Sequence, residues 1–164
     1  MIKQIKDNVF QLSFGKFGSC VYLLKLKDKD NKNILIDTSS KENRQELLLD
    51  LEKLKIKLEE ISIIILTHNH WDHNGNLELF KKSKIYALKN IGKFKVNGIK
   101  VIYTPGHTYD SICLLYKDIL FSGDTIFFNG IGRTDLPESQ PEKMQESLEK
   151  LKKLKYKILC PGHV

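Results

Sequence analysis

The chain has 164 residues, 41% hydrophobic and 29% charged, a composition typical of one globular domain with its own core. It has no apolar run of the roughly 18 to 20 residues that span a bilayer and no apolar stretch at its start, which predicts a cytoplasmic protein without membrane contact. Its three cysteines are far apart and none forms Cys-x-x-Cys. This argues against a disulfide framework or a thiolate zinc knuckle, and we expect three small buried thiols.

The formal net charge is +7, but Arg44 and Arg133 are the only arginines, and the lysines are spread along the whole chain. Between residues 41 and 60 the lysines alternate with acids. Lysine is poorly suited to bidentate recognition of phosphates or bases. We therefore expect a small-molecule substrate and disfavour nucleic acid as a partner without excluding it. The sequence does not predict an oligomeric state.

The first half of the chain contains short strands and one clear helix. Apolar segments predict strands at 9–14, 20–24 and 34–37, with a polar turn at 28–33. Ser39 and Glu42 have capping-box spacing, and leucines at helical spacing follow them, which predicts a helix over 40–56. A β-branched run at 61–66 predicts a buried strand, and we expect a short helix at 75–82.

Further strands are predicted in the second half, at 84–88, 99–103, 111–116, 118–122 and 157–160. A helix is expected to begin near Ser139 to Glu142, again with capping-box spacing, and to place Met144, Leu148 and Leu151 on one face. No repeat or linker interrupts the pattern, so residues 1–164 are predicted to form a single α/β domain with functional residues at strand ends.

Three of the five histidines lie in the stretch THNHWDHNG, directly after the predicted strand at 61–66. His68 and His70 are two residues apart and can point toward one metal from an extended segment. Asp72 and His73 follow as the chain turns, and they can reach a second metal. Neutral imidazole and carboxylate are ligands that divalent metals accept.

The remaining histidines, His107 and His163, both follow a Pro-Gly pair at the end of a predicted strand. Asp124 stands at the end of the apolar run 119–121, and Asp37 stands more weakly in a comparable place. A lone aspartate after a strand is usually a turn residue. Together with the histidines, these carboxylates predict a metal centre at the ends of several strands.

The four motifs, in order His68-x-His70-x-Asp72-His73, Pro105-Gly106-His107-Thr108, Ser122-Gly123-Asp124-Thr125 and Pro161-Gly162-His163, resemble the metallo-β-lactamase fold superfamily. The resemblance extends from the strand at 34–37 to residue 163. The segment Gly130–Pro137 is similar to the short glyoxalase II-type, hydroxyacylglutathione hydrolase-like metallo-hydrolases of that superfamily. The superfamily often has Asp-x-Gly where this chain has Asp37-Thr38-Ser39.

The resemblance implies a four-layer αββα sandwich, with two mixed β-sheets and helices on the outer faces. It also implies two divalent metal ions, with Zn²⁺ expected first and iron or manganese as alternatives. His68, His70 and His107 would hold the first metal, and Asp72, His73 and His163 the second. Asp124 would bridge the two.

A divalent metal lowers the pKa of bound water to about 7, and two metals can hold the resulting hydroxide and polarise a carbonyl. Asp72 can orient that hydroxide, so we expect it to be catalytic. Together with the resemblance, this chemistry implies a thioester hydrolase similar to glyoxalase II, which would act on a 2-hydroxyacyl thioester such as lactoyl-glutathione. The alternatives are a mononuclear-iron persulfide dioxygenase using His68, His107 and Asp124, a β-lactam or lactone hydrolase, and a metal-dependent nuclease.

Two further residues near the motifs are candidates for contact with substrate. Arg133 could bind a substrate carboxylate bidentately, although we favour an ion pair with Asp135 that fixes the loop. Trp71, the only tryptophan, is expected to pack beside the metals rather than to bind substrate.

Overall fold

The computed structural model describes residues 1–26 and 32–164 of the chain. Most of the turn predicted at 28–33 therefore lies outside the described residues. Contacts divide the chain into two compact units, residues 1–66 with 70–86 and residues 67–69 with 87–164. The single domain expected from the sequence remains a prediction.

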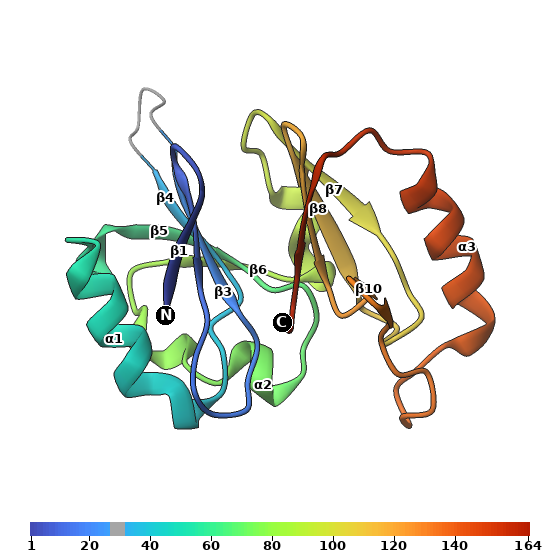
Figure 1. Ribbon diagram of the computed structural model, residues 1–164, viewed down its shortest axis with the longest axis horizontal. Helices are drawn as coiled ribbons and strands as arrows, with labels where there is room; N and C mark the ends of the chain where they lie inside the picture. Colours follow the sequence, from blue (N-terminus) through green and yellow to red (C-terminus); the bar gives the residue numbers. More distant parts are fainter. Residues whose placement is uncertain (27–31) are drawn as a thin grey trace. The chain divides into compact units, whose positions relative to one another are not determined.

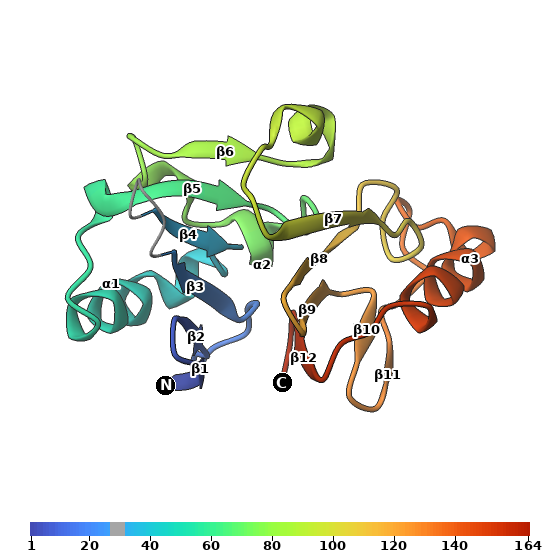
Figure 2. The same cartoon turned by 90° about the horizontal axis from the view of Figure 1, so that it is seen from above.

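The first unit contains a mixed sheet. Among the described residues its strands pair in the order β1-β2-β3-β4-β5-β6, antiparallel from β1 to β4 and parallel from β4 to β6 (Figure 2). The strands are β1 (Ile2–Lys6), β2 (Val9–Leu12), β3 (Val21–Lys25), β4 (Asn33–Ile36), β5 (Ile61–Ile65) and β6 (Lys84–Tyr86). β3, β4 and β5 are largely buried because their side chains are apolar on both faces.

Helix α1 (Arg44–Lys53) lies beside this sheet (Figure 1) and buries Leu47 and Leu51. A short 3-10 helix at Lys41–Asn43 precedes it. The very short helix α2 (Trp71–Asn74) follows β5, and 3-10 turns at Leu58–Glu60 and Leu77–Leu79 complete the described helical elements of this unit.

The second unit contains a four-stranded mixed sheet in the order β12-β9-β8-β7, in which β12 and β9 are parallel. In this part of the described chain the strands are β7 (Ile99–Tyr103), β8 (Ile112–Tyr116), β9 (Ile119–Gly123) and β12 (Ile158–Pro161). A small hairpin, β10 (Ile126–Phe127) with β11 (Gly130–Ile131), follows β9. A 3-10 helix at Leu88–Lys93 precedes β7.

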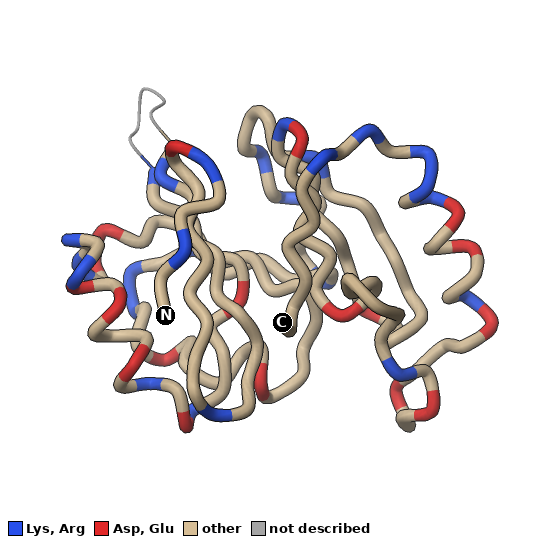
Figure 3. Tube along the Cα trace, viewed as in Figure 1, with Lys and Arg blue, Asp and Glu red and all other residues tan. Residues whose placement is uncertain are grey.

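Helix α3 (Pro141–Lys152) covers one face of the second sheet. Its Leu151 is buried in one cluster with Ile102, Cys113 and Leu120, which come from three neighbouring strands. Acidic and basic residues are interspersed along this helix (Figure 3), and Glu146 pairs with Lys143 and Lys150. Lys150, which hydrogen-bonds the Glu146 carboxylate, lowers the pKa of that carboxyl below its usual value.

The two mixed sheets with helices confirm the predicted α/β class, and most elements fall where the apolar pattern placed them. The three cysteines are buried and form no disulfide bond, as expected. None of the helices in the described parts of the chain is both long and apolar enough to cross a membrane.

Three local predictions need correction. The strand β1 was not anticipated, because its two isoleucines are three residues apart among lysines and a glutamine, without the period-two alternation of a strand. The Ser39 capping box is absent: Ser40 is the N-cap residue of the 3-10 helix and makes no side-chain cap bond. The helix expected at 75–82 is replaced by α2 at 71–74 and the 3-10 turn at 77–79, so the histidine cluster itself forms the helix start.

Candidate metal centre

The first unit presents three of the predicted ligands on the segment that enters and forms α2. His70 is the N-cap residue of this helix, in extended backbone, and Asp72 and His73 lie within the helix. Asp72 is 6% exposed and His73 is fully buried. One ligand atom of Asp72 lies within 4.8 Å of one of His73. A carboxylate in the first turn of a helix is stabilised by the orphan N–H groups there, even in a short helix.

Asp37, at the end of β4, holds His73 in place. Its carboxylate accepts a hydrogen bond from His73 Nδ1 at 2.8 Å, and both side chains are buried. Because the carboxylate accepts, the proton sits on Nδ1, and Nε2 is left as the nitrogen that can bind a metal. Asp37 adopts a left-handed backbone (φ 59°), which turns the chain sharply at the end of the strand. From the sequence, Asp37 was only a weak candidate for a metal ligand. In the structure its carboxylate orients His73 instead.

The second unit presents predicted ligands at the carboxyl ends of three strands. His107 follows β7, Asp124 follows β9 and His163 follows β12, as the Pro-Gly pairs predicted. One Asp124 carboxylate oxygen, Oδ2, lies 3.6 Å from His107 Nε2 and 3.4 Å from His163 Nε2. The Asp124 carboxylate therefore stands between two imidazoles within this unit.

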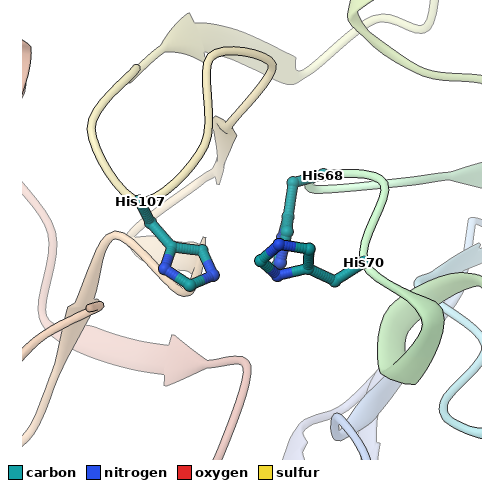
Figure 4. Close-up of side chains that lie close together, drawn as sticks. All are labelled: His68, His70 and His107. Carbon is teal, nitrogen blue, oxygen red and sulfur yellow. The ribbon is translucent and has the colours of Figure 1, made fainter. Parts of the chain in front are cut away.

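His68 belongs to the same unit, on the loop after β5. The loop is fixed where Ile112 N–H donates to the carbonyl of Thr67 at 2.8 Å. The imidazoles of His68 and His107 meet edge to face, with ring centroids 4.9 Å apart. Figure 4 shows these two rings, together with His70 two positions farther along the loop. A ligand atom of His68 also lies within 4.8 Å of one on Asp124.

The segment after β11 sets the orientation of His107. His107 Nδ1 donates to the backbone carbonyl of Arg133 at 2.8 Å. Gly132, the residue before it, passes so close to Asp124 that an added Cβ would lie 1.8 Å from the Asp124 carbonyl oxygen and 3.0 Å from the His107 ring. Only glycine fits at so short a distance, so this segment packs against two of the predicted ligands, Asp124 and His107.

The donor groups fit divalent metal ions. On His73, His107 and His68 the Nδ1 atom is engaged by a carboxylate, a carbonyl and the Thr67 hydroxyl respectively, the last at 3.1 Å. Metal-binding histidines generally carry such a partner on the second ring nitrogen, because it fixes both the tautomer and the ring orientation. All of the groups are imidazoles or carboxylates, which suit zinc, iron and manganese.

Of the two further residues near the motifs, Arg133 is placed as expected and Trp71 is not. Arg133 forms the ion pair favoured from the sequence, with Nε and one terminal nitrogen each 2.9 Å from the Asp135 carboxylate. This pair raises the pKa of Arg133 and lowers that of Asp135, in both cases chiefly through the side-chain hydrogen bonds. The expectation that Trp71 is packed is wrong: its side chain is 60% exposed, because the first position of α2 faces outward.

Comparison with known proteins identifies relatives over most of the chain. A probable metallo-hydrolase of Methanocaldococcus jannaschii is 36% identical over 143 residues, covering 79% of this chain and 70% of that protein. A hydroxyacylglutathione hydrolase of Idiomarina loihiensis is 34% identical over 82% of this chain, which spans 56% of the length of that enzyme. A protein crystallised in a di-iron-bound form has a similar fold, with a TM-score of 0.78, 23% identity and coverage of 94% of this chain and 92% of its own.

The family assignment follows from a match to the sequence itself. The family model described as the metallo-beta-lactamase superfamily matches residues 15–95 and 88–163, well over half of the chain. The chain therefore belongs to the metallo-beta-lactamase superfamily of metal-dependent hydrolases.

Proposed function

We propose that this protein hydrolyses acyl thioesters with two divalent metal ions, in the manner of glyoxalase II. His68, His70 and His107 would hold one ion, Asp72, His73 and His163 the other, and Asp124 would bridge them. Zn²⁺ is the first expectation for both, although a protein of similar fold has been crystallised with two irons. The substrate would be a small molecule rather than a nucleic acid.

The observation that carries the proposal is the set of oriented imidazoles at the predicted ligand positions. His73 and His107 each have Nδ1 bonded to an acceptor of their own unit, Asp37 and the Arg133 carbonyl, so their Nε2 atoms are prepared to bind a metal. Similarity to a hydroxyacylglutathione hydrolase supports the thioester as the bond that is cleaved.

When bound, two such ions supply a hydroxide at neutral pH and polarise a carbonyl group. Orientation of the attacking oxygen would come from a residue of the chain. Asp72, buried in the first turn of α2, would act as the catalytic carboxylate that orients the attacking oxygen. A thiolate leaves without strong help from an acid, so a thioester requires no further proton donor from the protein.

The test begins with the metal content and the thioesterase activity of one preparation, with lactoyl-glutathione as the reference substrate. We expect cleavage that chelators abolish and that returns with metal. Asp72→Ala should lower kcat/KM by several orders of magnitude, roughly the effect of losing both an orienting group and a ligand. Asp7→Asn, a change of charge at an exposed turn of the same unit, should leave the rate unchanged.

Parallel assays separate the alternatives. Oxygen uptake with glutathione persulfide by the iron-loaded protein, without thioester cleavage by the zinc-loaded protein, would assign the dioxygenase instead. Opening of β-lactams or lactones alone, or cleavage of RNA alone, would assign the other two classes.

A further inference from the structure

Helix α3 and the turn before it hold the main chain of the loop that carries His107. Three successive carbonyls of this loop each accept one hydrogen bond from residues 139–147. The bonds run from Ser147 Oγ to Pro105 at 2.6 Å, from Gln140 N–H to Gly106 at 2.8 Å and from Ser139 Oγ to His107 at 2.7 Å. All three loop residues are buried, so water cannot easily replace a lost donor.

The same loop lies directly against the backbone of α3. Gly106 is so close to the helix that an added Cβ would be 2.9 Å from Met144 Cα. The helix is itself anchored, because Leu151 is buried in the apolar cluster that it shares with the second sheet. The position of the loop is therefore set by α3 together with β7, the strand that it follows.

Ser139 joins this loop to the segment that orients the His107 ring. Its Oγ donates to the His107 carbonyl and also accepts a hydrogen bond from Leu136 N–H at 3.3 Å. Three residues before Leu136, the carbonyl of Arg133 accepts the hydrogen bond from His107 Nδ1. One continuous segment, residues 133–147, therefore holds both the ring and the main chain of His107.

We propose that Ser139 and Ser147 are positioning residues for the metal centre, because their hydroxyls hold the main chain of His107 in the place from which Nε2 binds metal. This inference rests on the ligand set of the proposed function, in which His107 holds one of the two ions, and not on the substrate. A ligand that is fixed before the metal arrives loses less conformational freedom on binding, so the metal binds more tightly. Neither serine itself touches the metal.

A positioning role and a purely structural role give different results. A bond that only stabilises the fold contributes equally to the metal-free and the metal-loaded protein. Its loss lowers the free energy of unfolding of both forms and leaves the dissociation constant of the metal unchanged. A bond that positions His107 contributes more to the loaded form, so its loss also weakens metal binding.

Competition with a chromogenic chelator measures Zn²⁺ affinity without any substrate. Ser139→Ala and Ser147→Ala should each weaken binding of the ion that His107 holds by roughly 2- to 13-fold, the effect of one net hydrogen bond. Ser139→Thr keeps a hydroxyl and should retain most of the affinity. The visible absorption of bound Co²⁺ depends on its coordination geometry, and it should differ from that of the wild type in Ser139→Ala.

Ser83→Ala is the matched control, because it removes the same kind of bond far along the chain from the ligands. Ser83 Oγ donates to the carbonyl of Ile61 at 2.6 Å, at the amino end of β5, whereas the predicted ligands follow the carboxyl end of that strand. This variant should be less stable in urea, with the Zn²⁺ affinity and the Co²⁺ spectrum of the wild type.

His107→Ala separates this inference from the ligand set on which it rests. If His107→Ala loses metal while Ser139→Ala and Ser147→Ala bind it as the wild type does, the positioning role is wrong and the ligand set stands. An equal loss of affinity in Ser83→Ala would likewise overturn the positioning role. Wild-type affinity in His107→Ala would defeat the ligand set itself, and the inference with it.

Discussion

Replacing Asn76 by alanine should strongly destabilise the protein, because this buried amide holds the loop that follows β4. Asn76 is fully buried, and its Nδ2 donates to the carbonyls of Thr38 at 2.8 Å and Ser40 at 2.7 Å. Its Oδ1 accepts from Arg44 Nε at 3.1 Å. One side chain thus ties the 38–40 loop to the segment after α2.

The size of the effect follows from what each partner loses. The Ser40 carbonyl keeps a bond from Asn43 N–H, so losing Asn76 there costs about 0.5–1.5 kcal/mol. The Thr38 carbonyl is buried, and losing its amide donor costs a further 1–3 kcal/mol, roughly. Arg44 is partly exposed and can turn to water. We expect a total of about 1.5–4.5 kcal/mol, or a fall in Tm of roughly 3–18 °C.

Urea unfolding followed by far-UV circular dichroism measures this change. The slope m should stay the same while the midpoint falls. Asn76→Asp keeps the size of the side chain but directs a carboxylate at two carbonyls, and it should destabilise at least as much. Asn129→Ala, at an exposed hairpin position, should stay within about 0.5 kcal/mol. A loss below about 1 kcal/mol for Asn76→Ala would refute the reasoning, since it would mean that both carbonyls find other partners.

Three further outcomes are expected. Asp124→Ala should lower the content of both metals and His163→Ala mainly that of one, as elemental analysis would show; wild-type content in Asp124→Ala would contradict the bridging role. Asp37→Asn should weaken metal binding roughly 10- to 100-fold in competition with a chelator, because His73 loses the charged acceptor that fixes its tautomer and orientation, and unaltered affinity would remove Asp37 from the site. Burial raises the pKa of the Cys113 thiol to about 11, so at pH 8 only roughly a thousandth is thiolate. Iodoacetamide should therefore spare Cys113 in the folded protein and modify it in urea, which peptide mass spectrometry can follow; rapid modification of the native protein would show that the thiol is accessible.

The sequence predicts the fold well where apolar periodicity is strong. The runs at 61–66, 99–103 and 111–122 became β5, β7, β8 and β9 with boundaries within a residue or two. β1 was not predicted because it is mostly exposed and its sequence lacks the alternation of apolar and polar residues. Helix starts were less predictable, since Ser39 has the right spacing for a cap but adopts a left-handed backbone that a cap residue does not use.

In the candidate site, the residue types can be predicted from the sequence, but the contacts that orient them cannot. Residue type and strand-end position predict that His107, Asp124 and His163 lie close together, and in the second unit they do. The orienting parts of Asp37 and of the Arg133 carbonyl depend on contacts between distant segments. A backbone carbonyl leaves no signal in a sequence at all, and the exposure of Trp71 depends on which face of a single helical turn meets solvent.

Ser39 occupies a place that relatives often give to glycine, and its backbone is left-handed (φ 59°), the conformation for which glycine is favoured. The serine offsets its strain of roughly 1–2 kcal/mol in part through a buried bond in which its Oγ accepts from Asn43 Nδ2 at 3.1 Å. Glycine would relax the backbone and lose that bond, so the two residues are close to interchangeable here. A search signature that demands glycine at this position would pass over this chain.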